Sequence, residues 1–158
     1  MAKKKFNLYL TSVLLFMLAL PVICIVVQAH QLNEIYNWQL VGKWFLFWSV
    51  GIRLFIAGLK QVIQPDFTAK QIFQFNSDES FIVIRELGFA NVSIGLIGIL
   101  SLIKPAWNAL AAIAGGLYFG LAGLWHLLKR PESKNEVIAM ISDIFIFLLM
   151  LFYFIYTL

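Results

Sequence analysis

Residues 137–158 read VIAMISDIFIFLLMLFYFIYTL, and this stretch decides the class of fold. It is almost wholly apolar, it holds one charged residue, Asp143, and it exceeds the roughly 20 residues that a helix needs to cross a bilayer. Comparable stretches occupy residues 6–27, 41–59, 81–103 and 106–128. The sequence therefore predicts an all-α, polytopic transmembrane helix bundle of five spans that forms one domain over residues 1–158.

Composition supports this class of protein. The chain is 61% hydrophobic and 13% charged, whereas soluble domains carry about 25% charged residues. The net charge of +4 comes from basic residues beside the spans, a topology signal that argues against nucleic acid as a partner. The single cysteine, Cys24, excludes an internal disulfide and a two-cysteine redox pair.

The distribution of basic residues predicts an orientation with the N-terminus inside and the C-terminus outside. Only Lys43 and Lys104 then fall on the outer side. Lys3–Lys5 ahead of the first span, and Val27-Gln28-Ala29 at its end, resemble a secretory signal, but its apolar run is longer than such signals use. We interpret it as an uncleaved anchor, and we expect a multi-pass protein of a bacterial or archaeal cytoplasmic membrane. The inner side receives Lys3, Lys4, Lys5, Lys60, Lys70, Lys129, Arg130 and Lys134.

Ionisable residues interrupt each of the last four spans. Counted along the helices, all lie within roughly 10 Å of the inner boundary. Because charge inside a membrane usually faces the bundle interior and has a partner, we expect a polar cluster at this depth. Arg85 and Glu86 point in directions about 100° apart, so span 81–103 is expected to reach two neighbours and to be central. With Asn91, the predicted cluster comprises Arg53, Arg85, Glu86, Asn91, His126 and Asp143.

Several functions are open to this cluster. It can be a structural network of ion pairs, or it can line a pocket that binds a ligand or relays protons. His126, Glu86 and Asp143 could also supply three metal ligands, but no ligand spacing supports this, and we predict neither a metal site nor catalytic residues.

Small residues mark the predicted helix contacts. In span 106–128, Ala112, Gly116 and Gly120 recur every fourth residue, a spacing that lets helices approach closely in lipid. In span 81–103, one helix face carries a second set together with Asn91, whose carboxamide is either an interhelical contact or a ligand contact. That second set comprises Gly88, Gly95 and Gly98.

Two links are informative. In the inner link 60–80, Pro65-Asp66 can begin a short helix, with Ala69, Ile72 and Phe73 on an apolar side that would lie along the membrane interface. The link 129–136 is short, which predicts that the last two spans are antiparallel neighbours.

These motifs resemble an uncharacterised family of small five-helix membrane proteins. The resemblance rests on RELGFAN at 85–91, on Gly95 and Gly98, on GLAGLWH ending at His126, and on SDIFI around Asp143. QPDF at 64–67 is similar to the family's link before its third helix. A weaker similarity, through RLFIAGLKQVI at 53–63 and Glu86, reaches the DoxX-like four-helix proteins, some of which partner quinone-linked oxidoreductases. It implies an N-terminal anchor followed by a DoxX-like four-helix bundle.

We therefore predict a non-enzymatic membrane module or accessory subunit, held together by its polar cluster and partnered by lipid, another membrane protein or a second copy. The alternative is a pocket protein that binds a small apolar or quinone-like ligand, or relays protons, in support of a redox complex.

Overall fold

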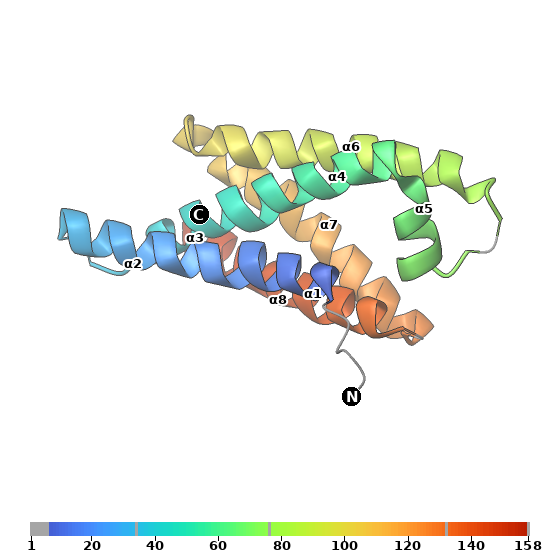
Figure 1. Cartoon of the computed structure of the whole chain (residues 1–158). Helices are drawn as coiled ribbons and strands as arrows, with labels where there is room; N and C mark the ends of the chain where they lie inside the picture. The colour runs from blue at the N-terminus through green and yellow to red at the C-terminus, as the bar shows by residue number, and fades with distance from the viewer. Residues whose placement is uncertain (1–6, 34, 76, 132, 158) are drawn as a thin grey trace.

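The computed structural model describes residues 7–33, 35–75, 77–131 and 133–157. Within them, five helices are long and apolar enough to span a membrane, and there is no strand. Figure 1 shows α6 along one edge of the bundle, α4 beside it, α1 and α2 toward the opposite side with α8, and α7 crossing behind. The five spans are Leu8–Leu32, Trp38–Ile63, Ser80–Ser101, Pro105–Lys129 and Lys134–Thr157.

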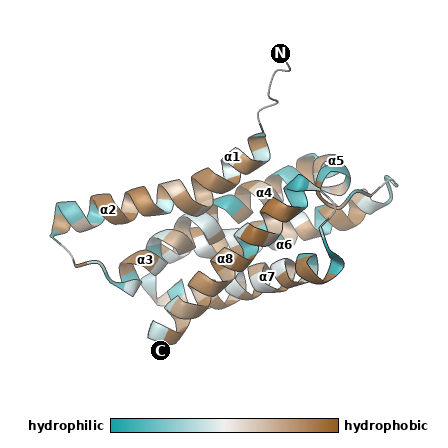
Figure 2. Cartoon of the chain, turned by 90° about the horizontal axis from the view of Figure 1, so that it is seen from below, coloured by the Kyte–Doolittle hydropathy of each residue, from teal (hydrophilic) through white to brown (hydrophobic). Residues whose placement is uncertain are grey.

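The first two spans are each built of three segments. The first comprises α1 (Leu8–Leu14), η1 (Leu15–Ala19) and α2 (Leu20–Leu32), and the second comprises α3 (Trp38–Phe45), η2 (Leu46–Ile52) and α4 (Arg53–Ile63). The remaining spans are α6 (Ser80–Ser101), η4 (Pro105–Trp107) with α7 (Asn108–Lys129), and α8 (Lys134–Thr157). Figure 2 shows hydrophobic residues along most of each long helix and hydrophilic ones toward the ends and links.

Helix ends differ from the predicted span ends because caps, rather than hydropathy, terminate a helix. The first helix continues past residue 27 to Leu32, where Asn33 adopts a left-handed conformation with φ of 49°. The second begins earlier than predicted, since the Asn37 side chain accepts a hydrogen bond from the Leu40 amide at 2.8 Å. Phe6, Leu158 and Lys3–Lys5, used in the predictions, lie outside the described residues.

The first two spans both contain a π-helical turn, η1 and η2, where the regular backbone bonding shifts. Such turns are frequent at functional sites. The Ser49 hydroxyl of η2 donates to the Phe16 carbonyl of η1 at 3.2 Å. This bond joins the two irregular turns, and η2 ends at the residue before Arg53, the first residue of α4.

The glycine face of α6 packs against η2 and α4. A Cβ added at Gly88 would lie 2.8 Å from the Gly58 carbonyl oxygen, and one added at Gly98 would lie 2.7 Å from the Gly51 nitrogen. Gly95 lies equally close to the backbone at Phe55. Backbone contacts this short exclude any side chain, so these glycines set the distance between the helices.

The small residues of α7 face its neighbours. Ala112 is buried, Gly116 lies against Met150, and Gly120 lies against the Phe147 ring of α8. α7 and α8 form a long antiparallel pair, as the short link between them predicts.

α6 is peripheral, which corrects the expectation of a central third span. Its buried residues, which include Ile84, Gly88 and Asn91, lie on one face, and the main contacts of α6 are with η2, α4 and α7. The opposite face is exposed. Counting residues gives the depth of a charge, but it does not show how many sides of a helix are covered.

The inner link folds back onto the bundle. α5 (Pro65–Phe67) and η3 (Thr68–Ile72) form a short helical segment, and Pro65, Ala69 and Ile72 are buried. The segment contacts α6 and α8. Its apolar side therefore covers protein, whereas the sequence indicated a helix lying on the membrane interface.

Candidate functional site

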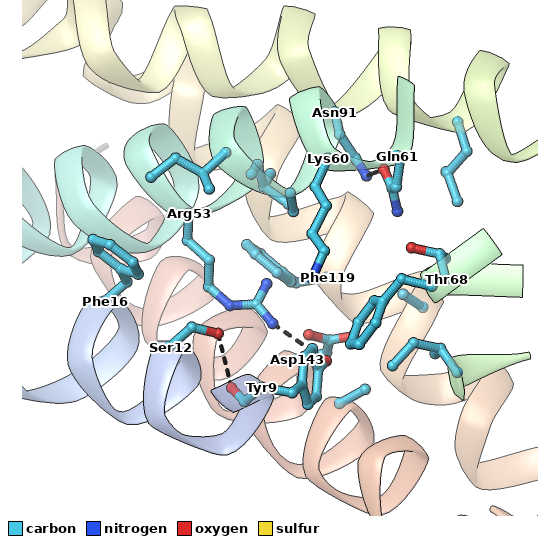
Figure 3. Close-up of a pocket in the computed structure, with 18 of the residues that line it drawn as sticks. Tyr9, Ser12, Phe16, Arg53, Lys60, Gln61, Thr68, Asn91, Phe119 and Asp143 are labelled. Atoms are coloured by element: carbon cyan, nitrogen blue, oxygen red, sulfur yellow. Dashed lines mark hydrogen bonds between the residues drawn. The ribbon is translucent and has the colours of Figure 1, made fainter. Parts of the chain in front are cut away.

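A cavity of about 370 Å³ lies between the helices near one end of the bundle. Its walls come from α1, α4, the 65–72 segment, α6, α7 and α8 (Figure 3). Ligand pockets typically span about 300–1,000 Å³ and combine apolar walls with a few placed polar groups. Of the predicted cluster, Arg53, Asn91, His126 and Asp143 line this cavity.

Arg53 enters the cavity from the first turn of α4. Its Nη2 donates to the Tyr9 hydroxyl at 3.4 Å, and its Cζ lies 6.0 Å from the centre of that ring. Its Nε is buried and has no hydrogen-bond partner. A guanidinium can only donate, so this atom requires an acceptor.

Asp143 lies on α8, lines the same cavity as Arg53 and is 7% exposed. Figure 3 shows its carboxylate near the guanidinium, but the ion pairs formed by the described residues do not include one between these two side chains. The pocket thus places a cation and a carboxyl group side by side without joining them directly.

Two carboxamides form the third polar feature. Asn91 Nδ2 of α6 donates to Gln61 Oε1 of α4 at 2.7 Å, and both side chains are buried. The Tyr118 side chain lies beside Asn91, yet Asn91 Oδ1 accepts no hydrogen bond of ordinary geometry. Asn91 therefore bridges two helices, and it brings an unpaired acceptor to a side chain that lines the pocket.

His126 connects the pocket with a buried ion-pair cluster. Its Nδ1 lies 3.2 Å from Glu136 Oε1, and Lys129 Nζ lies 3.6 Å from the same oxygen. The Phe73 ring stacks on the imidazole at 6.3 Å between centroids. The bond between Nδ1 and Oε1 takes its proton from the imidazole when the carboxyl group is ionised, because a carboxylate only accepts.

Sequence reasoning missed Glu136. It had been assigned to the link 129–136, whereas α8 begins at Lys134 and Glu136 has no exposed surface. The first turn of a helix is a favourable position for an acidic residue. This preference is the signal in the sequence that could have identified Glu136 as part of the last helix. Tyr9 and Gln61 were also missed, because they lie near the ends of predicted spans, where polar residues are common.

Arg85 and Glu86 do not join the pocket. Both are exposed on α6, on the side away from the helices that α6 contacts. They share the depth of the other charges but point elsewhere, which corrects the expectation of one cluster. The described residues contain no group of three or more His, Cys, Asp or Glu placed to hold a metal.

The fold and the site define a class: a multi-pass membrane bundle that encloses a partly polar pocket among its helices. The chain belongs to a family described as "Family of unknown function (DUF6790)", whose match covers residues 7–157. No curated protein and no solved structure matches it. The weaker resemblance to DoxX-like proteins has no support from these matches and stays a prediction.

Proposed function

We propose that this protein binds a small, largely apolar ligand with a hydroxyl-bearing or carbonyl-bearing ring, quinone-like in its chemistry, in the pocket lined by Arg53, Asn91 and Asp143. One observation carries the proposal. Arg53 and Asn91 both line one cavity, and each holds a buried polar atom, Arg53 Nε and Asn91 Oδ1, that has no hydrogen-bond partner among the described residues. Leaving such an atom unsatisfied costs about 1–3 kcal/mol, so a ligand that satisfies both gains affinity.

The two atoms need hydrogen-bond partners of opposite kinds. Arg53 Nε donates and needs an acceptor, while Asn91 Oδ1 accepts and needs a donor. A hydroxyl group does both, and a ring with an oxygen at each end offers a donor or an acceptor at two places. Apolar side chains such as Phe16, Phe73 and Phe119 line the same cavity, and they suit the faces of a flat ring.

The proposed setting is a cytoplasmic membrane with the N-terminus inside. The pocket then lies toward the inner leaflet, open to ligands that partition into lipid. In this setting the protein acts as a non-enzymatic accessory module that holds its ligand.

The test uses the full chain, purified in mild detergent. Its bound lipids and cofactors are identified by mass spectrometry, and binding of a short-chain quinone and of its quinol is then titrated calorimetrically. Arg53→Met removes a charge-assisted donor worth about 1.5–3 kcal/mol, so affinity is expected to fall about tenfold or more. Asn91→Leu is expected to weaken the quinol more than the quinone.

Leu121→Ala, on the exposed surface of α7, is the matched control and is expected to bind as the unmodified chain does. Each variant is also melted without ligand. If neither probe binds the unmodified chain, or if both pocket variants bind with unchanged affinity, the proposal is wrong.

A purely structural role is the second candidate, and the buried Glu136 cluster favours it. Under that role, Arg53→Met and Asn91→Leu lower the melting temperature, and no ligand is retained.

A further inference from the structure

The outward face of α6 carries two charged side chains that contribute no ion pair to the fold. Arg85 and Glu86 are exposed, and neither forms an ion pair or hydrogen bond with the described residues. Glu86 lies six residues beyond Ser80, about 9 Å along the helix by its rise. Charge at that depth facing lipid is costly and calls for a partner.

Snorkelling accounts for only one of the two residues. The long side chain of arginine can reach back to the boundary. A glutamate is shorter, and Glu86 lies between Ile82 and Phe89, whose side chains are more than half exposed. A carboxylate in this position gains most from a cation at the same depth.

The exposed face also has the pattern of a helix-pairing seam. Its residues recur at alternating spacings of four and three, the spacing of positions that interlock in a coiled coil. They lie opposite the face of Gly88, Asn91 and Gly95 that packs on α4. The seam consists of the exposed residues Ile82, Glu86, Phe89, Ser93 and Leu96 and of the half-buried Leu100.

We infer that this α6 seam binds a second copy of the same chain in a parallel, two-fold symmetric dimer. Two copies inserted with one orientation place their α6 helices parallel and at equal depth. In parallel pairing, a seam residue that stands three residues before the next one, as Glu86 does, enters a hole bordered by its own counterpart and by the residue just before that counterpart. For Glu86 that preceding residue is Arg85, so each glutamate meets an arginine of the other copy.

Symmetry makes the match complete. A two-fold interface is self-complementary: if Arg85 of one copy meets Glu86 of the other, the reverse pair forms as well. Ser93, whose hydroxyl is bonded to the Phe89 carbonyl of its own helix, leaves a small position in the seam where the two backbones can approach.

The first experiment places a cysteine in the seam. Cys24→Ser removes the natural cysteine, and Ser93→Cys is added in native membranes with a mild oxidant. We expect a disulfide-linked dimer. Leu148→Cys in the same background is the control, because it is exposed at a similar depth on α8, away from α6, and it is expected to stay monomeric.

The second experiment tests the ion pairs. Arg85→Glu and Glu86→Arg each place like charges opposite each other, and each is expected to lower dimer formation, followed by energy transfer between labelled copies in vesicles, by at least about tenfold. The double variant Arg85→Glu/Glu86→Arg is expected to restore it. Pairing unaffected by the single variants, or equal crosslinking at Ser93→Cys and Leu148→Cys, overturns the inference. A monomer that captures a different membrane protein through this face overturns it too.

Discussion

At the scale of single residues, Glu136 is the most constrained charge in the molecule. It is fully buried and lies within ion-pair distance of His126 and Lys129. Burying a carboxylate costs several kcal/mol unless cations and hydrogen bonds compensate. The cluster therefore fixes the α7–α8 hairpin and holds the imidazole that borders the pocket.

Glu136→Gln keeps the shape and removes the charge. We expect it to lower stability by about 3 kcal/mol, because it breaks a buried pair and leaves a cation without its counter-charge. Thermal unfolding in detergent measures this. Lys134→Gln is the control: this lysine is exposed and takes no part in the ion pairs of the described residues, so a change of about 0.5 kcal/mol or less is expected. Equal melting of Glu136→Gln and the unmodified chain would show that the carboxyl group is not ionised in the fold.

The sequence could identify some pocket residues and not others, for a physical reason. Arg53, Asn91, His126 and Asp143 are conspicuous because a polar group inside an apolar run is costly. Tyr9, Gln61 and Glu136 look ordinary, since they lie where spans begin or end. Arg85 and Glu86 are equally conspicuous but face outward. The sequence could not show this, because the periodicity of a helix fixes the relative directions of its side chains and leaves open which direction faces the protein.

At the scale of elements, glycine contacts between α4 and α6 carry the packing. The spacing of Gly88, Gly95 and Gly98 predicts a close contact along one face. It does not identify the neighbour, and the structure supplies it as the Gly51–Gly58 side of the second span. Stability of this pair depends on backbone approach rather than on side-chain burial.

Gly58→Ala tests the contact between these two elements. A Cβ at this position would lie 2.6 Å from the Gly88 carbonyl oxygen and 2.7 Å from the Val92 nitrogen. Because backbone atoms cannot rotate away, the helices must separate, and we expect a loss of about 1–3 kcal/mol in thermal unfolding.

Gly116→Ala is the matched control for that substitution. Its nearest atoms belong to the Met150 side chain, at 3.1 Å and 3.9 Å, and the better helix propensity of alanine, worth about 1 kcal/mol, offsets the tighter contact. A Gly58→Ala variant as stable as Gly116→Ala would contradict close backbone packing of α4 on α6.

At the scale of the whole molecule, the pocket is closed from the end by the chain itself. The 65–72 segment contributes Phe67, Thr68 and Ile72 to the cavity wall, and Lys60 Nζ lies 3.6 Å from the centre of the Phe67 ring. This end of the bundle also holds the link 129–136. If the positive-inside bias sets the orientation, the pocket faces the cytoplasmic leaflet.

That orientation can be tested with single cysteines in a Cys24→Ser background. Lys104 and Lys134 lie at opposite ends of the bundle and are both exposed. With the N-terminus inside, a membrane-impermeant thiol reagent applied to intact cells is expected to label Lys104→Cys, and to label Lys134→Cys only after the membrane is opened. The Cys24→Ser chain alone reports background labelling. Labelling in the reverse pattern would place the pocket and its closing segment in the outer leaflet, where a ligand would enter from the opposite side.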